Sequence, residues 1–174
     1  MKHFYCISGT MGVGKTTTCR ILKQKLDRSV FLDGDWCWDS HPFQVTEETK
    51  HMVIDNICYL LNNFIRCSAY DNIIFCWVMH QQAIIDRILT GLSLEHVQLH
   101  SISLICSEAA LKDRLRRDVA NRLRTDDVIE RSTARLPLYD NLDTVKIDVS
   151  HISPEETAQK MIQMGLDANE NGFF

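Results

Sequence analysis

The chain has 174 residues, of which 45% are hydrophobic and 24% charged, and its formal net charge is −4. This length suits one domain with a substantial hydrophobic core. The acidic balance disfavours nucleic acid as a partner, because phosphate backbones attract basic surfaces. No apolar run approaches the ~20 residues of a membrane-spanning helix, and the opening "MKHFYCISG" is not typical of a signal peptide.

The seven cysteines are scattered, odd in number and never spaced as C-x-x-C. Most of them lie in apolar runs, where a free thiol behaves as a small hydrophobic side chain. We therefore expect reduced cysteines and a cytoplasmic protein.

Strand-like runs alternate with segments of helical periodicity along the whole chain. Strands are predicted at 3–8, 30–33, 72–78, 97–106 and 145–149, and helices at 14–26, 47–64, 81–89, 108–123 and 154–164. The strands are almost continuously apolar, as expected when both faces of a sheet are covered. This alternation predicts a three-layer α/β/α sandwich with a five-stranded parallel sheet, formed by one domain over residues 1–174. In such folds ligands bind beyond the carboxyl ends of the strands.

Residues 9–16, with the sequence GTMGVGKT, match the phosphate-binding pattern G-x-x-x-x-G-K-[ST] directly after the first predicted strand. The glycines permit a tight loop whose N–H groups point at phosphate oxygens, and the next helix adds its positive N-terminus. Lys15 is expected on the β- and γ-phosphates and Thr16 on Mg²⁺. The residues predicted to bind ATP here are Gly9, Thr10, Met11, Gly12, Val13, Gly14, Lys15, Thr16 and Thr17.

The rest of the chain distinguishes between classes of P-loop protein. A guanine-binding Asn/Thr-Lys-x-Asp element is not formed by residues 144–148, TVKID, because valine interrupts the spacing. The strand 72–78 ends without the carboxylate typical of motor ATPases.

Two carboxylates, Asp33 and Asp35, lie at the end of the second predicted strand instead. Residues two apart in an extended chain face the same side. One carboxylate can hold Mg²⁺, and the other can accept the proton of an acceptor hydroxyl.

With the P-loop, Asp33-Gly34-Asp35 and an arginine-rich segment before the last strand, the chain resembles the small P-loop kinases of the nucleotide and shikimate kinase group. This group includes gluconate kinases, adenylylsulfate kinases and antibiotic phosphotransferases. The resemblance implies that Asp33 lies near Mg²⁺ and that Asp35 binds the acceptor and acts as catalytic base. Residues 78–82, VMHQQ, lack the glycine run that receives shikimate in shikimate kinases, so shikimate is not the expected acceptor.

Many arginines lie between Lys112 and Arg135, and residues 117–135 are predicted to form an arginine-rich lid. The interleaved aspartates leave open an ordinary helix with surface ion pairs. The resemblance implies that Arg114 stacks on adenine, with Ser150 and His151 lining that pocket. Arg117 and Arg122 are expected to contact phosphates during catalysis, and Arg135 to face the acceptor or the γ-phosphate.

Aromatic residues and histidines follow the second and third strands. Together with Asp33 and Asp35, the residues expected to form the acceptor site are Trp36, Trp38, His41, Phe43, Trp77 and His80. Aromatic walls and few basic residues favour an acceptor with a flat or apolar body.

These features predict an ATP- and Mg²⁺-dependent phosphotransferase that moves the γ-phosphate to a hydroxyl or phosphate of a small molecule. A nucleoside- or nucleotide-like acceptor is the leading expectation, and an antibiotic or a sugar acid is the alternative. An ATP-binding regulatory module without an acceptor is the alternative of another class. We expect a monomer or homodimer with neither nucleic acid nor membrane as a partner.

Overall fold

The computed structural model describes residues 1–170; residues 171–174 of the predicted domain lie outside the described residues. One sheet of parallel strands has the order β2-β3-β1-β4-β5. The strands are β1 (Lys2–Ser8), β2 (Ser29–Asp33), β3 (Asn72–Trp77), β4 (Val97–Ile105) and β5 (Val145–Asp148). Each differs from its predicted range by at most one residue at either end.

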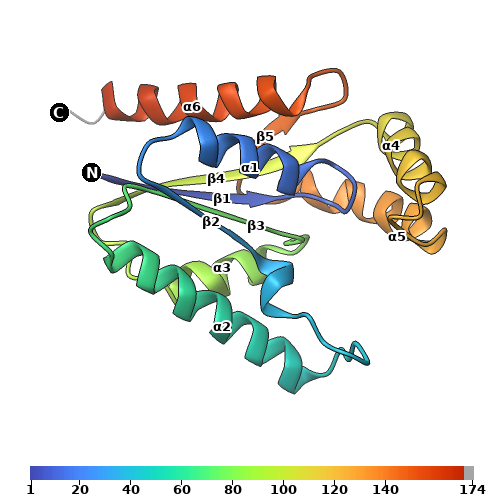
Figure 1. The fold of residues 1–174 in the computed structure, drawn as a ribbon, viewed down its shortest axis with the longest axis horizontal. Coiled ribbons are helices and arrows are strands. Elements are labelled where there is room, and N and C mark those ends of the chain that lie inside the picture. Colours follow the sequence, from blue (N-terminus) through green and yellow to red (C-terminus); the bar gives the residue numbers. More distant parts are fainter. Residues whose placement is uncertain (171–174) are drawn as a thin grey trace.

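Helices cover both faces of the sheet, so the predicted three-layer sandwich is confirmed (Figure 1). The helices α1 (Lys15–Lys25) and α6 (Pro154–Glu170) cover one face, and α2 (Glu47–Arg66) and α3 (Gln82–Thr90) cover the other. Alternate residues of β1 enter the two cores: Phe4 and Cys6 pack beneath α2 and α3, whereas Tyr5 and Ile7 pack beneath α1 and α6. Burial on both faces explains why the strands are continuously apolar.

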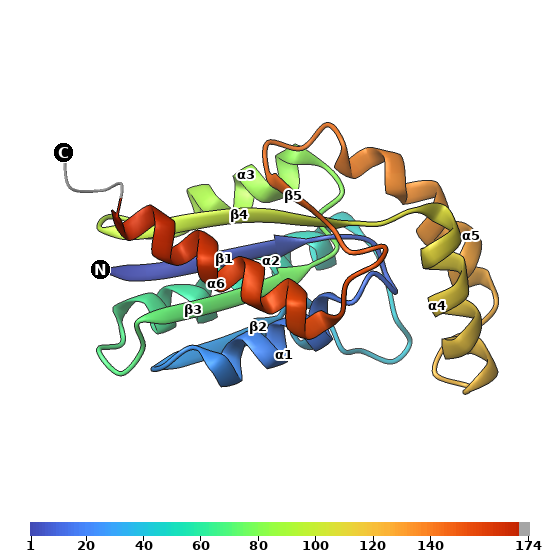
Figure 2. The same cartoon turned by 90° about the horizontal axis from the view of Figure 1, so that it is seen from above.

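Two further helices, α4 (Glu108–Ala120) and α5 (Asp127–Arg135), lie beyond the carboxyl ends of the strands (Figures 1 and 2). We call residues 108–135 the α4–α5 segment. The predicted helix 108–123 ends early because the chain reverses at Arg122, which has a φ of 56°. The amide of Leu123 donates to the carbonyl of Asp118 at 2.9 Å within this turn. Leu111, Leu115 and Val128 are buried between the two helices.

The register of the sheet aligns the carboxyl ends of three of its strands, β1, β2 and β3. Ser8, the last residue of β1, pairs with Trp77, and Asp33, the last residue of β2, pairs with Cys76. The P-loop, the two aspartates and the residues after Trp77 therefore leave the sheet at one edge.

None of the helices in the described residues is long and apolar enough to cross a membrane. All seven cysteines lie in the described part of the chain, and each is a free thiol, as predicted.

Candidate active site

The P-loop connects β1 to α1 and holds a buried lysine. Gly12 and Gly14 have φ values of 81° and 108°, which side chains with a Cβ rarely adopt. The Lys15 ammonium donates to the carbonyl oxygen of Thr10 at 3.0 Å. Burial lowers the pKa of Lys15, while Cys76, Asp35 and Asp33 act in the opposite direction. The lysine is thus held close to carboxylates in the place where the motif predicts phosphate binding.

Asp33 is bound directly to the P-loop helix. The Thr16 hydroxyl donates to Oδ2 of Asp33 at 2.7 Å, and the backbone N–H of Asp35 donates to Oδ1 at 3.1 Å. Asp33 is 5% exposed, and it caps the short 3₁₀ turn η1 (Gly34–Cys37). The Asp-Gly-Asp sequence therefore forms a capped turn that faces the phosphate loop, and not a remote surface bend.

Asp35 points into the same region and is held by β3. Its Oδ1 accepts a hydrogen bond from the indole N–H of Trp77 at 3.1 Å. The Asp35 side chain is accessible to solvent, yet surrounding protein atoms partly desolvate it. This desolvation and the nearby Asp33 raise the pKa of Asp35, while Lys15 and Trp77 oppose the shift. A carboxylate with a raised pKa beside a lysine is typical of a proton acceptor in a catalytic site.

A polar cavity of about 280 Å³ brings these groups together with α4. Its lining residues are Met11, Gly12, Gly14, Lys15, Thr16, Thr17, Asp33, Asp35, Val78, Arg114, Asp118 and Arg124. Both predicted carboxylates and the P-loop lysine therefore share one cavity.

An adjoining, mostly apolar pocket of about 130 Å³ lies between the P-loop and the start of α6. It is lined by Val13, Gly14, Thr17, Thr18, Arg114, Val149, Ile152, Pro154 and Thr157. Arg114 belongs to both cavities and donates to the carbonyl of Val13 at 3.1 Å and to that of Val149. A nucleotide whose phosphates bind at Lys15 would reach this pocket with its flat base. Val149 and Ile152 were not among the residues predicted to bind the nucleotide; Val149 ends the last predicted strand, 145–149, and Ile152 follows it.

Ser150 lines neither of these two cavities. Its hydroxyl donates to Asp148 at 2.6 Å and accepts from the N–H of Ser107 at 2.8 Å. These bonds tie the end of β5 to the start of α4. The hydroxyl and the backbone N–H of Ser150 both donate to Asp148 and lower the pKa of its carboxyl. The neighbouring His151 is exposed.

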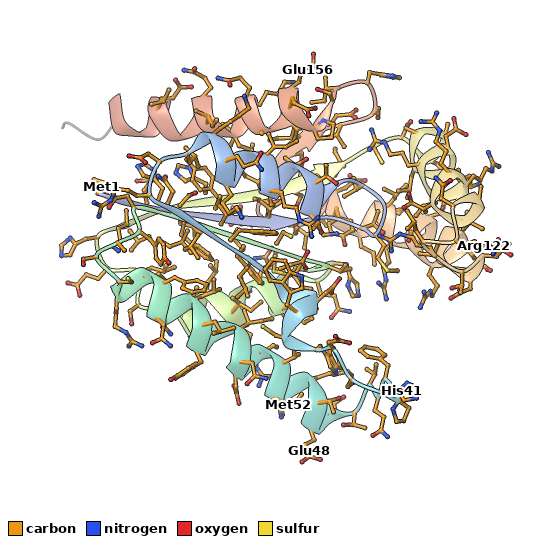
Figure 3. The ribbon with its side chains drawn as sticks, in the orientation of Figure 1. Met1, His41, Glu48, Met52, Arg122 and Glu156 are labelled. Carbon is orange, nitrogen blue, oxygen red and sulfur yellow. The ribbon has the colours of Figure 1, made fainter. Side chains whose placement is uncertain are left out.

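The arginines of the α4–α5 segment have different surroundings. Arg124 lines the polar cavity and pairs with Asp118, with 3.1 Å between Nε and Oδ2. Arg117 and Arg122 are exposed and line neither cavity, and Arg122 lies at the tip of the segment (Figure 3). Arg135 lies at the other end of α5, where its charge acts on His80 and Tyr139.

The predicted acceptor residues fall into two groups. Trp38 packs on Phe43 and Trp77, with ring centroids 5.1 and 6.4 Å apart. Trp36 is 55% exposed, and its ring packs edge-on against that of Phe31 at 5.2 Å, on the α1 side of the sheet. His41 is exposed on the loop before α2 (Figure 3). Trp38, Phe43 and Trp77 therefore form one aromatic group, which contacts Asp35 through Trp77.

Thr16 and Asp33 present a hydroxyl and a carboxylate to the same place, the oxygen donors that Mg²⁺ prefers. No group of three or more His, Cys, Asp or Glu residues in the described part of the chain is arranged to hold a metal ion.

The family model AAA_18, described as AAA domain, matches residues 6–136. A comparison with curated proteins found no match. Among solved structures, a tunicamycin resistance protein of Deinococcus radiodurans is 20% identical with a TM-score of 0.71, covering 100% of this chain and 98% of that chain. A gluconokinase of Sinorhizobium meliloti is 14% identical with a TM-score of 0.70, covering 98% and 97%. A shikimate kinase of Acinetobacter baumannii in complex with shikimate is 22% identical with a TM-score of 0.62, covering 100% and 96%. The chain therefore belongs to this AAA domain family and has the fold of small P-loop kinases.

Proposed function

We propose that the protein is an ATP-dependent phosphotransferase that moves the γ-phosphate of ATP to a hydroxyl or phosphate of a small molecule. A nucleoside- or nucleotide-like acceptor is the leading candidate. The observation that carries this proposal is the shared cavity of Lys15, Asp33 and Asp35 at the P-loop. A phosphate-binding loop alone would suit any nucleotide-binding protein, whereas a second, partly desolvated carboxylate beside it suits transfer to a hydroxyl.

In the proposed reaction, Lys15 leaves the Thr10 carbonyl and binds the β- and γ-phosphates. Thr16 and Asp33 would hold Mg²⁺, which neutralises phosphate charge when bound. Asp35 orients an acceptor hydroxyl and takes its proton as the new oxygen–phosphorus bond forms. The bond between the γ-phosphorus and its bridging oxygen breaks, and ADP leaves with that oxygen. Arg114 borders the adenine pocket, and Arg124 is placed to stabilise charge on the transferring group.

The proteins of similar fold support this reading. Their names are those of a gluconokinase and of shikimate and APS kinases, the last in complex with AMPPNP and APS. An antibiotic-type acceptor is the second candidate, because one protein of similar fold is a tunicamycin resistance protein. A sugar acid is a further candidate, because another is a gluconokinase. The free cysteines agree with a cytoplasmic location.

Two substitutions test the proposal, because they separate nucleotide binding from transfer. Lys15→Ala should abolish ATP binding, measured by calorimetry, whereas exposed Lys23→Ala at the far end of α1 should not. Asp35→Asn should preserve ATP affinity and reduce transfer at least about a hundredfold. Asp39→Asn, a neighbouring exposed carboxylate, is the matched control. The assay is ATP consumption across nucleosides, nucleotides, sugars, sugar acids and antibiotics.

The alternative is an ATP-binding regulatory module. It would hydrolyse or bind ATP equally with and without every acceptor in the panel, and Asp35→Asn would then leave ATP turnover unchanged. A competition experiment between GTP and ATP for binding at the P-loop distinguishes a phosphotransferase or a regulatory module that uses ATP from a GTPase.

A further inference from the structure

The polar cavity contains a third acidic residue, Asp118, besides Asp33 and Asp35. The other two carboxylates have roles in the proposed reaction, whereas Asp118 has none there. A carboxylate close to bound phosphates repels them, so Asp118 opposes nucleotide binding unless it acts on a neighbouring group. In the described residues, the one hydrogen-bonded partner of its carboxylate is Arg124, with 3.1 Å between Oδ2 and Nε.

The hydrogen bond to Asp118 engages only the Nε edge of the Arg124 guanidinium. In the part of the chain that the structure describes, the terminal nitrogens Nη1 and Nη2 of Arg124 have no protein partner. The charge of this guanidinium acts on Asp35 across the cavity. Because guanidinium groups bind phosphate oxygens through two parallel N–H bonds, the terminal nitrogens are available to a phosphate while the Nε edge is anchored.

The backbone after α4 brings Arg124 back beside Asp118, which lies six positions earlier. Arg122 has a φ of 56°, and the N–H of Leu123 donates to the carbonyl of Asp118 at 2.9 Å. Asp118 follows Arg114 by four residues on α4, and both side chains line the polar cavity from one face of this helix. The Arg124 guanidinium is thus held by a residue of a regular helix and not by the turn alone.

The base of the α4–α5 segment is fixed to the P-loop. The Thr10 hydroxyl donates to the carbonyl of Ser132 at 2.9 Å, and both residues are 0% exposed. A Cβ at Gly12 would lie 2.4 Å from Cδ2 of Leu115, so the loop backbone packs directly on α4. The position of Asp118 relative to the phosphate loop is therefore set before a nucleotide binds.

We infer that Asp118 is a positioning residue, which fixes Arg124 so that its two terminal nitrogens face the phosphoryl group in transfer. This inference rests on the proposed function and adds a residue to it. Preorganised donors stabilise charge in the transition state without having to reorient during the reaction. Since Asp118 itself touches no substrate in this role, its loss should lower kcat and leave the affinity for ATP almost unchanged.

The first test needs no acceptor. Binding of ADP and Mg²⁺ is measured by calorimetry, with and without aluminium fluoride, which mimics the phosphoryl group in transfer. Asp118→Asn should weaken binding of ADP with aluminium fluoride about tenfold, and binding of ADP alone by less than about threefold. Asp113→Asn is the matched control and should change neither, since Asp113 forms an exposed ion pair with Arg116 on the same helix. Equal effects of Asp118→Asn on both ligands, or no effect, would overturn the inference.

The second test asks whether Asp118 acts through Arg124. In the Arg124→Ala protein, Asp118→Asn should weaken the aluminium fluoride complex by less than about a further twofold, because no guanidinium remains to be positioned. Asp118→Glu keeps the carboxylate and should therefore lose less affinity than Asp118→Asn. A further loss of about tenfold in the Arg124→Ala protein would show that Asp118 acts directly, against the inference.

The acceptor panel separates this inference from the proposed function. If Asp118→Asn weakens the aluminium fluoride complex but the unmodified protein phosphorylates no compound, the positioning role stands and the kinase proposal fails. If a compound is phosphorylated with the same kcat by both proteins, the kinase proposal stands and the positioning role fails. Tighter ATP binding by Asp118→Asn with an unchanged kcat would show only repulsion between Asp118 and phosphates, which also overturns the inference.

Discussion

The indole N–H of Trp77 donates to Oδ1 of Asp35 at 3.1 Å, and the same ring leaves no room for a side chain at Gly34. A Cβ at Gly34 would lie 2.5 Å from Cγ of Trp77. The last residue of β3 thus fixes both the backbone and the carboxylate of the turn that follows β2. Trp77 was expected to touch the acceptor, and its contacts in the structure are with the candidate base.

Trp77→Phe should keep the ring and remove the hydrogen bond. Loss of a hydrogen bond to a charged group, about 1.5 kcal/mol, corresponds to roughly a tenfold lower kcat if the bond orients Asp35 for transfer. Burial and Asp33 raise the pKa of Asp35, and the Trp77 bond opposes them because it stabilises the ionised form. The acid limb of kcat against pH should therefore move to higher pH in the variant. ATP affinity serves as the internal control, and an unmoved acid limb would contradict the role of Trp77.

Gly34→Ala should destabilise the protein, because the new methyl group overlaps the Trp77 ring. Overpacking of this kind typically costs about 1–3 kcal/mol, measured by urea unfolding. The same substitution in a Trp77→Ala background should cost less, since most of the overlapping ring is gone. If Gly34→Ala lowered the free energy of unfolding equally in the wild-type and Trp77→Ala proteins, the overlap would not be with the Trp77 ring.

Arg124→Ala should reduce phosphoryl transfer at least about tenfold, because Arg124 lines the polar cavity and its charge acts on Asp35. Arg116→Ala is the control, since Arg116 is exposed and forms an ion pair with Asp113 on the surface of α4. The structure predicts a smaller effect for Arg122→Ala than for Arg124→Ala. A larger effect at Arg122 would instead favour the arginine assignment made from the sequence, through a motion of the α4–α5 segment.

The free energy of unfolding should fall in mild acid because His100 is buried in its neutral form. Its ring is 6% exposed, stacks on Tyr5 at 4.6 Å, and approaches His3 with 3.0 Å between Nε2 and Nδ1. Burial and His3 lower the pKa of His100 from 6.5 to about 4. Below pH 6.5 His100 therefore binds a proton in the unfolded chain but stays neutral in the folded protein. The free energy of unfolding should fall progressively between pH 6.5 and about pH 4.

The full loss through this histidine is about 3 kcal/mol, at 1.36 kcal/mol per pH unit. Urea unfolding at pH 7 and pH 5 measures it. His100→Phe should reduce the difference between the two values, and an unchanged difference would assign the acid sensitivity to other groups.

The order of elements, the three layers and the P-loop could all be predicted from the sequence. Apolar strand runs and helical periodicity are local properties, so the limits of β1, β2 and β3 were nearly right. The single helix expected over 108–123 was too long, because a reversal at a left-handed Arg122 leaves no clear mark in the sequence. The proximity of Asp33 and Asp35 to Lys15 also followed from sequence, since parallel strands end at one edge.

By itself, then, the sequence determined a parallel α/β sheet, a phosphate loop and two carboxylates at its edge, because motif spacing and periodicity act over a few residues. Only the tertiary structure decided that Arg124 and not Arg122 lines the cavity, that Val149 and Ile152 border the adjoining pocket, and that Trp77 binds Asp35. These contacts join residues far apart in the chain, 42 positions in the case of Trp77 and Asp35. Their partners are set by how whole elements pack against each other, which no local pattern encodes.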